Sequence, residues 1–194
     1  MPEQRVYLVA GLGNPGPKYE NTRHNAGFMA IDALADRYRI SVQRTKFDVI
    51  YGRGTIEGVE TILAKPQAFM NRSGPPIRQL ADYFRIQPEA VVIVHDDIDL
   101  AFERLKIKEK GGDGGHKGIR SLIQALGSGD FVRLRVGVGR SQTRADVVDH
   151  VLGPFSRDEQ SALDEILHRS VEAIATILSK GTLEGMNRYN QSPR

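Results

Sequence analysis

The spacing of hydrophobic positions changes repeatedly along the first third of the chain. Residues 5–10 (RVYLVA) form a short apolar run that ends at a glycine, which predicts a buried strand. Apolar side chains then recur at helical spacing in residues 25–38 (NAGFMAIDALADRY), which predicts an amphipathic helix. Residues 47–66 alternate in polarity and are broken by glycines near their middle, so we expect a β-hairpin there.

The middle of the chain exchanges helical and extended patterns in the same way. Residues 75–84 and 118–127 each carry one apolar stripe at helical spacing, and Gly127 is placed to end the second helix. Between them, residues 90–100 (AVVIVHDDIDL) form a continuous apolar strand that runs into acidic residues. Carboxylates at the carboxyl end of such a strand lie where open α/β sheets place their sites.

Charged and apolar residues alternate in residues 104–110 and 133–136. In a strand this pattern places the basic side chains on one face and the apolar side chains on the other. The clearest helical pattern covers residues 156–181, and it opens with the capping-box spacing of Ser156 and Glu159. Strands and helices therefore follow one another to the end of the chain.

This alternation predicts an α/β fold with a central mixed, mostly parallel β-sheet flanked by helices on both faces. The chain has 194 residues, of which 40% are hydrophobic, and this is enough for one well-buried domain. We find no internal repeat, low-complexity tract or linker, so we expect residues 1–194 to form a single domain.

Charge and cysteine content narrow the class of protein. The 27 basic and 24 acidic residues nearly balance, so the net charge of +3 is a weak argument for a polyanionic partner. The chain has no cysteine, which excludes disulfides, thiolate nucleophiles and cysteine-bound metals and fits a reducing compartment. The N-terminal residues lack the apolar core of a signal peptide, and no stretch reaches the roughly 20 apolar residues of a membrane span. We therefore expect a soluble, cytoplasmic protein.

The first glycine-rich segment, residues 11–16 (GLGNPG), has the Gly-x-Gly-x-x-Gly spacing of dinucleotide-binding loops. That function requires a helix that begins near the third glycine and an acidic residue at the end of the next strand. Prolines and polar residues delay the helix here, and Asp32, at the right distance, falls inside the helical pattern. A plain glycine-proline turn would explain the glycines but not the crowding of Asn14, His24 and Asn25 beside a predicted sheet.

Four motifs together resemble those of one enzyme family. They are GLGNPGPKYENTRHNAGF (11–28), KPQAFMNRSG (65–74), VHDDIDL (94–100) and GGDGGHKG (111–118). In their order and their spread over the whole chain they resemble the bacterial-type peptidyl-tRNA hydrolases. These enzymes cleave the ester that joins a peptide to the 3′-terminal ribose of tRNA, and so recycle tRNA from aborted translation. The resemblance implies that activity for this chain.

The resemblance also implies which residues do the chemistry. His24 matches the family's catalytic base, and Asp96 matches the carboxylate that orients it, with water as the nucleophile and no covalent intermediate. The absence of a Gly-x-Ser-x-Gly motif and of cysteine agrees with water in that role. Asn14 and Asn71 match asparagines of the family's site, where an amide can hold a carbonyl oxygen or a ribose hydroxyl. Taken alone, each of these asparagines would be typical of a turn.

Several other residues are candidates for substrate contact. Tyr19, Phe69 and Met70 supply either an apolar shelf for the peptide or the terminal adenine, or ordinary core. His116, beside glycines, either approaches the cleft or only begins a helix. Position 117 is lysine where the family commonly has asparagine. Lys117 therefore either binds a phosphate or the oxyanion, or points away.

The basic strand faces are candidates for contact with phosphate. Alternating charge usually marks a solvated face, but two such strands near a glycine loop favour a phosphate site. The resemblance places Lys108 and Arg135 where the family clamps the terminal phosphate of tRNA, which implies salt-sensitive binding. We expect peptidyl-tRNA as the partner, held at its 3′ CCA end and its 5′ phosphate region, with no membrane contact and a monomeric chain. Residues 141–152 are placed to act as a mobile cover over the cleft.

Two alternatives remain open on the residues alone. Asp96, Asp97 and Asp99 suggest a Mg²⁺ site, but strand alternation separates Asp97 from the other two. Because ester hydrolysis by activated water needs no metal, we expect neither a metal nor a cofactor. A non-catalytic RNA-binding module of the same fold, like the plant organellar splicing factors, would not need a base and its orienter. Lys117 is the one feature that favours such a module.

Overall fold

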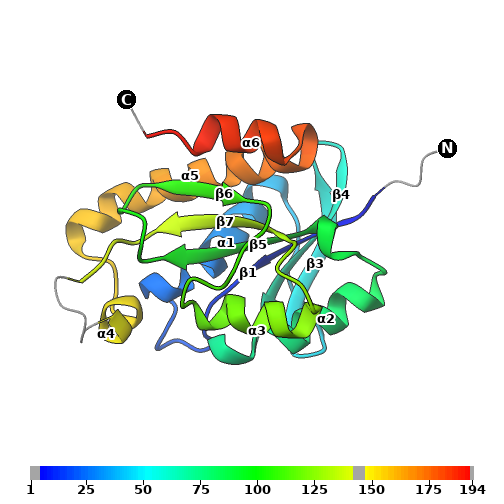
Figure 1. The fold of residues 1–194 in the computed structure, drawn as a ribbon, viewed down its shortest axis with the longest axis horizontal. Coiled ribbons are helices and arrows are strands. Elements are labelled where there is room, and N and C mark those ends of the chain that lie inside the picture. The colour runs from blue at the N-terminus through cyan, green and yellow to red at the C-terminus, as the bar shows by residue number, and fades with distance from the viewer. Residues whose placement is uncertain (1–4, 142–146, 193–194) are drawn as a thin grey trace.

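The computed structural model describes residues 5–141 and 147–192, which build one seven-stranded sheet between two layers of helices (Figure 1). The strands lie in the order β2-β3-β4-β1-β5-β7-β6. Their bounds are β1 Tyr7–Gly11, β2 Arg44–Lys46, β3 Val49–Ile56, β4 Val59–Pro66, β5 Val91–Asp97, β6 Leu105–Lys108 and β7 Val132–Gly137.

The centre of the sheet is parallel and its two edges are antiparallel. β1 pairs in parallel with β4 and β5, and β5 pairs in parallel with β7. The predicted hairpin over residues 47–66 is present as the antiparallel pair of β3 and β4. At the two edges of the sheet, β2 pairs antiparallel with β3, and β6 pairs antiparallel with β7. The carboxyl ends of β1, β4, β5 and β7 therefore meet at one edge of the sheet. The predicted mixed, mostly parallel sheet is confirmed.

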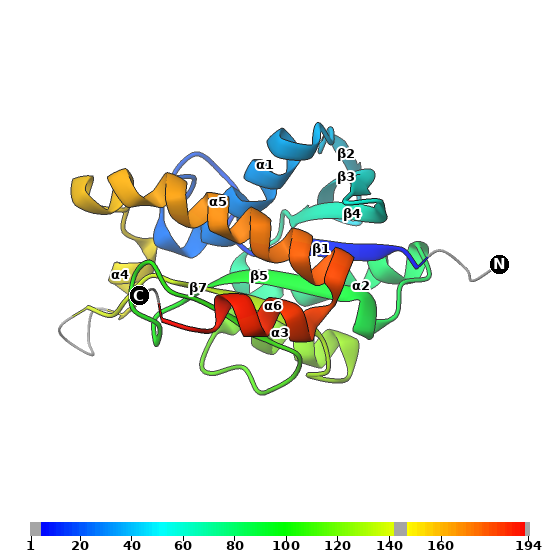
Figure 2. The same cartoon turned by 90° about the horizontal axis from the view of Figure 1, so that it is seen from above.

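Helices cover both faces of the sheet, as predicted (Figure 2). The helices are α1 Ala26–Tyr38, α2 Gly74–Tyr83, α3 Lys117–Leu126, α4 Val147–Leu152, α5 Arg157–Lys180 and α6 Thr182–Tyr189, with short 3₁₀ turns η1 Arg23–Asn25, η2 Met70–Arg72 and η3 Pro88–Ala90. α1, α5 and α6 pack on one face, and α2 and α3 pack on the other. No helix within the described ranges is both long and apolar enough to cross a membrane.

The central strands are buried on both sides because helices cover both faces. In β1, Leu8 and Ala10 pack toward α2 and α3, whereas Val9 packs toward α1 and α5. Residues of β5 divide in the same way, with Ile93 on the first side and Val94 on the second. This double burial explains why both strands are continuous apolar runs in the sequence rather than alternating ones.

The helix boundaries follow the capping signals in the sequence. Gly127 ends α3 with a positive φ of 75°, and its amide donates to the carbonyl of Ile123. At the start of α5, the hydroxyl of Ser156 accepts from the Glu159 N–H at 3.2 Å, and the Glu159 carboxylate accepts from the Ser156 N–H at 2.6 Å. The sequence pattern did not predict α6, which follows α5 directly after Gly181.

Candidate active site

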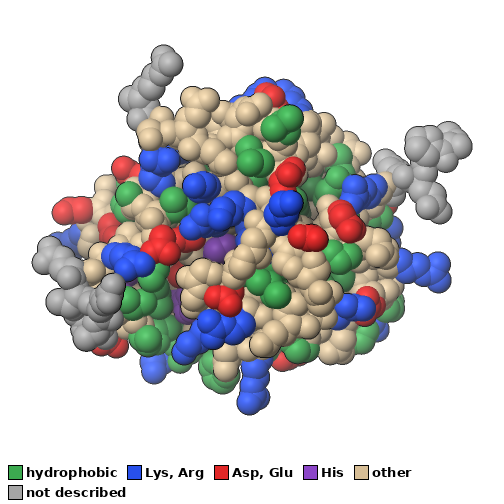
Figure 3. Space-filling view, in the orientation of Figure 1, with side chains coloured by type: hydrophobic (Ala, Val, Ile, Leu, Met, Phe, Trp, Pro, Cys, Tyr) green, Lys and Arg blue, Asp and Glu red, His purple; other side chains and the backbone are tan. Residues whose placement is uncertain are grey.

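A crevice opens at the carboxyl ends of β1 and β4. After β1 the chain turns to α1 on one face of the sheet, and after β4 it turns to α2 on the other. Open α/β sheets bind ligands at such points. A cavity of about 790 Å³ lies there and extends over the end of β5. Figure 3 shows histidine side chains in this hollow, with Lys and Arg side chains beside it.

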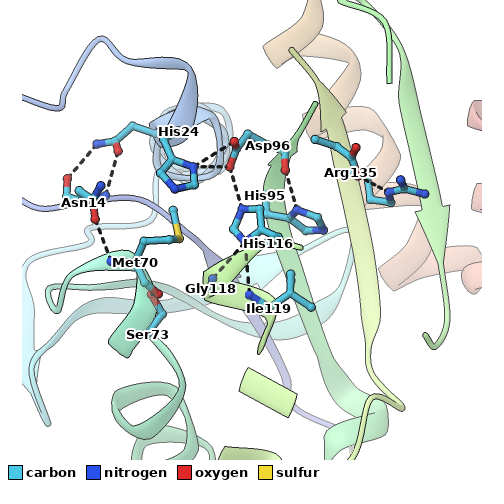
Figure 4. A network of polar contacts seen from close by, with 12 residues as sticks. Asn14, His24, Met70, Ser73, His95, Asp96, His116, Gly118, Ile119 and Arg135 are labelled. Carbon is cyan, nitrogen blue, oxygen red and sulfur yellow. Dashed lines mark hydrogen bonds and ion pairs between the residues drawn. The ribbon is translucent and has the colours of Figure 1, made fainter. Parts of the chain in front are cut away.

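The floor of the cavity holds a histidine–carboxylate pair. His24 lies in η1, and Asp96 lies near the end of β5 with 1% of its surface exposed. The Nδ1 atom of His24 is 2.9 and 3.0 Å from the two carboxylate oxygens of Asp96 (Figure 4). Because a carboxylate only accepts, Nδ1 carries the proton, and Nε2 keeps a lone pair that can take a proton from water.

The surroundings of Asp96 keep it ionised. Burial by itself would raise the pKa of Asp96, but the neighbouring rings of His24 and His116 outweigh it and hold the pKa well below its usual range. His95 is affected differently, because burial and then repulsion from His116 lower its pKa to about 3. The neutral His95 ring donates from Nδ1 to the backbone oxygen of Asp96 at 2.7 Å.

A second histidine contacts the same carboxylate. The Nε2 atom of His116 is 2.9 Å from Asp96 Oδ1, and its Nδ1 accepts from the backbone N–H groups of Gly118 and Ile119 at 3.1 and 3.3 Å. Among the described residues, the ligand atoms of His24, Asp96 and His116 lie within 4.8 Å of one another, close enough for a metal ion. However, two incoming N–H donors require the lone pair of His116 on Nδ1 and its proton on Nε2. This tautomer leaves Nε2 no lone pair for a metal.

Three hydrogen bonds hold Asn14 just beyond the end of β1. Its backbone N–H donates to Asn25 Oδ1, and its carbonyl accepts from Asn25 Nδ2, both at 2.9 Å. Its own Oδ1 accepts from the backbone N–H of Met70 at 2.8 Å, which ties the end of β1 to the turn after β4. Since Oδ1 is occupied, the two N–H donors of Asn14 Nδ2 remain for a bound group.

The glycines of residues 11–16 serve close packing. A Cβ atom on Gly11 would lie 2.1 Å from the carbonyl oxygen of Gly27 in α1, and a Cβ atom on Gly13 would lie 2.7 Å from the ring of Phe28. The helix α1 begins only at Ala26, well after the third glycine. The contact of β1 with α1 therefore explains the first two glycines, and the geometry of a dinucleotide loop is not formed.

Basic residues line the side of the cavity formed by β6, β7 and the start of α3. Lys108 and Arg135 both border the cavity, and Arg135 forms an ion pair with Asp97. Lys117, the first residue of α3, is exposed and borders the cavity as well. Arg133 shares the strand face of Arg135 but is buried and donates to backbone carbonyls. The sequence interpretation of this face as solvated is therefore wrong for Arg133, although Arg133 also borders the cavity.

The three aspartates of the HDDID segment point to different partners. Asp96 contacts histidines on the cavity floor, Asp97 pairs with Arg135, and Asp99 pairs with Arg140. Strand alternation predicted that Asp97 would separate from Asp96. The arginine partners separate Asp99 as well, so the three carboxylates do not form the cluster that Mg²⁺ would need.

Nearly the whole chain matches a known protein family. The family model described as peptidyl-tRNA hydrolase covers residues 8–194. The chain belongs to this family. The peptidyl-tRNA hydrolase of Bacillus subtilis is 45% identical over 185 residues, which are 95% of this chain and 98% of that protein. The peptidyl-tRNA hydrolase of Exiguobacterium sibiricum is 46% identical over 182 residues, which are 94% of this chain and 98% of that protein.

Solved structures of the family agree with the fold. The crystal structure of the peptidyl-tRNA hydrolase from Acinetobacter baumannii superposes with a TM-score of 0.89 at 38% identity. The match covers 96% of this chain and 95% of that chain. The family resemblance inferred from the four sequence motifs is thus confirmed.

Apolar segments border the cavity of this peptidyl-tRNA hydrolase family member on two sides. In and before η2, Phe69 is 58% exposed, Met70 is buried and Asn71 is exposed, and all three line the cavity. α4 contributes Val148 and Leu152 to the lining. α4 belongs to the segment expected to act as a cover, but residues 142–146 of that segment lie outside the described residues.

One predicted peptidyl-tRNA contact, Tyr19, does not line the cavity, and two further residues, Asn25 and Asp97, position groups that do. Tyr19 is not among the residues that line the cavity. The side chain of Asn25 hydrogen-bonds to the backbone N–H and carbonyl of Asn14. In the sequence, only its position next to His24 in the first motif indicated a role in the site. Asp97 holds Arg135 in place, and no local pattern in the sequence indicated that contact.

Proposed function

We propose that this protein hydrolyses the ester between the peptide and the 3′-terminal ribose of peptidyl-tRNA, and so recycles tRNA from aborted translation. The observation that carries the proposal is the His24–Asp96 pair on the cavity floor, with the pinned Asn14 also lining the cavity. A base, a carboxylate that orients it and an amide donor meet the needs of ester hydrolysis by water.

His24 acts as the general base in this proposal. Its Nε2 takes a proton from a water molecule while the water oxygen attacks the carbonyl carbon of the ester. Asp96 holds the proton on Nδ1 and balances the positive charge of the imidazolium. When the tetrahedral intermediate collapses, the bond to the ribose oxygen breaks and the imidazolium returns its proton to that oxygen. The products are the peptide carboxylic acid, which ionises in water, and tRNA with a free hydroxyl.

Asn14 is assigned to the oxyanion. Its Oδ1 is already engaged by Met70, so its Nδ2 donates to the carbonyl oxygen as negative charge develops there. This orientation is set before substrate arrives, which is the condition for strong electrostatic stabilisation in a site. Asn71, exposed in the adjacent turn, is assigned to a ribose hydroxyl or the peptide carbonyl.

The remaining walls of the cavity suit the rest of the substrate. The exposed ring of Phe69 and the apolar residues of α4, which all line the cavity, offer a stacking or apolar surface to the terminal adenine or the peptide. Lys108 and Arg135 are assigned to the 5′ phosphate region, and Lys117 to a phosphate or the oxyanion.

Hydrolysis of N-acetyl-aminoacyl-tRNA, compared with free aminoacyl-tRNA, tests the proposal. In the presence of EDTA we expect rapid release from the blocked substrate alone. His24→Ala should abolish the release, because no base remains. His168→Ala is the matched control, since it removes an exposed histidine of α5 outside the cavity.

Two other results of this experiment would contradict the proposal. Binding of tRNA by the wild-type protein without release would contradict the enzyme and leave the RNA-binding module. Release that requires added Mg²⁺ beyond what folded tRNA needs would contradict the metal-free mechanism. Lys117→Asn, measured beside them, shows whether the lysine at this position changes the rate of release.

A further inference from the structure

Both ring nitrogens of His116 are engaged within the protein. His116 is the N-cap of α3, where its Nδ1 accepts from the backbone N–H groups of Gly118 and Ile119. Its Nε2 points to Asp96 Oδ1 at 2.9 Å, the same oxygen that His24 Nδ1 contacts (Figure 4). A neutral imidazole has one N–H and one lone pair, so the cap at Nδ1 assigns the proton to Nε2.

We propose that His116 is a positioning residue, locked by the cap of α3 in the Nε2–H tautomer, that holds Asp96 in the orientation His24 requires. The inference rests on the proposed function for its effect on rate, but the tautomer itself is a property of the protein without substrate. It gives His116 a role different from the substrate contact that the sequence suggested.

In this tautomer the Asp96 carboxylate accepts hydrogen bonds from two imidazole rings. Asp96 Oδ1 accepts from both His116 Nε2 and His24 Nδ1, and the carboxylate is buried. If the donor from His116 is lost, the carboxylate can rotate, and its charge is offset by one N–H group fewer. It then holds a proton on the His24 ring more strongly, which opposes the base form at low pH and slows return of the proton to the leaving oxygen.

Among the described residues, few other titratable groups face this assembly. His95 contacts the His116 ring edge-to-face from β5, with ring centroids 4.8 Å apart, and is neutral. Arg135 approaches from β7, on the side of His95, and Asp113 approaches His116 from the glycine-rich loop. All three remain unchanged in the variants below, so a change in the pH profile reports on the contact between His116 and Asp96.

Two substitutions separate the two contacts of His116. In His116→Asn, the side-chain oxygen takes the place of Nδ1 and keeps the cap, but no donor reaches Asp96. In His116→Gln, the amide nitrogen takes the place of Nε2 and keeps the donor, but the cap is lost. A purely structural role predicts that the Asn variant is active and the Gln variant impaired. The positioning role predicts the reverse order of activity.

We expect His116→Asn to lower kcat about tenfold, with KM nearly unchanged, and to move the acidic limb of the kcat/KM profile to higher pH. Its Tm should stay close to that of the wild type. We expect His116→Gln to keep kcat and the acidic limb, and to lower Tm by about 2–4 °C through loss of the cap. Wild-type kcat and acidic limb in His116→Asn, or loss of activity that follows Tm in both variants, would overturn the proposal.

The tautomer can be measured directly. Nitrogen-15 NMR of the imidazole rings near neutral pH should show Nδ1 of His116 unprotonated and Nε2 protonated in the substrate-free protein. A protonated Nδ1 would contradict the lock whatever the activity. Conversely, a wild-type protein that shows this tautomer but releases nothing from blocked aminoacyl-tRNA would refute the proposed function and leave the tautomer intact.

Discussion

The two sides of the cavity are built differently. On the floor, Asp96 is buried and contacts two histidines, and Asn14 is pinned by backbone and side-chain hydrogen bonds. On the basic side, Lys108 and Lys117 are exposed and have no ion pair within the described residues, while Arg135 has one. The difference fits the tasks proposed for the two sides. Stabilising a transition state needs groups fixed in advance, whereas attraction to phosphate acts over a distance and tolerates mobile side chains.

The basic side itself contains a second contrast, between two arginines of β7. Both border the cavity, but Arg133 donates from its guanidinium to the carbonyl oxygens of Gly111, Gly112 and Gly129, whereas Arg135 pairs with Asp97. Arg133 holds the glycine-rich loop through backbone carbonyls, and Arg135 is held by a carboxylate beside the cavity. The comparison predicts large effects on kcat from the floor and salt-dependent effects on binding from the basic side.

Asp96→Asn should cause the largest loss in kcat, about 10²–10⁴-fold. The amide keeps the size of the side chain but cannot balance the imidazolium or accept from both histidines. Single-turnover release from blocked aminoacyl-tRNA measures the effect, with Asp99→Asn as the control because Asp99 is exposed and pairs with Arg140. A loss below tenfold would contradict the assignment of catalysis to the floor of the cavity.

Asn14→Asp should follow, with a loss of about 10²–10³-fold in kcat. The carboxylate preserves the acceptor for the Met70 N–H but replaces the two Nδ2 donors by an acceptor with negative charge. Circular dichroism and Tm should show that the fold survives. Unchanged kcat in a folded variant would show that Asn14 only ties β1 to the turn after β4.

Lys108→Ala should act on binding. We expect KM to rise about tenfold at low salt, kcat to stay the same, and the slope of log KM against log salt to fall by about one. Lys110→Ala is the matched control, because this exposed lysine lies near Lys108 but does not line the cavity. Equal effects of the two substitutions would show that Lys108 acts only through its general positive charge and not through a specific phosphate contact.

Glu159→Gln should have the smallest effect, on stability rather than on chemistry. Burial alone would raise the pKa of Glu159, but hydrogen bonds from the Ser156 N–H and from Arg23 lower it below its usual range. The carboxylate therefore stabilises the fold fully above its ordinary pKa of 4.5, and this contribution is lost as pH falls through the lowered value.

Urea unfolding of Glu159→Gln at neutral and acidic pH measures this contribution. We expect a loss of about 1 kcal/mol at pH 7 that disappears in acid. Arg23 precedes His24 and pairs with Glu159 of α5. The same variant therefore also tests whether the position of His24 depends on this ion pair. A kcat close to that of the wild type would show that the hydrogen bonds within the floor are sufficient by themselves.

The sequence by itself determined most of the elements and their boundaries. The period of the hydrophobic residues, the positions of glycines and the spacing of capping residues are local properties of the sequence. The end of α3 at Gly127 and the start of α5 after Ser156 could therefore be predicted from the sequence alone. The same local signals missed α6, because Gly181 marked the end of the preceding helical pattern and only a short segment follows. The family motifs added His24, Asp96 and the asparagines as candidates, without their geometry.

Only the tertiary structure decided which of these groups touch. His24 reaches Asp96 across 72 residues of chain, and Met70 reaches Asn14 across 56. Strand alternation places Arg133 and Arg135 on one face of β7. Only the tertiary structure shows that Arg133 donates to the glycine-rich loop, whereas Arg135 pairs with Asp97. A hydrogen bond depends on where both partners are placed by packing at the crossover of the sheet, and local periodicity carries no information about that placement.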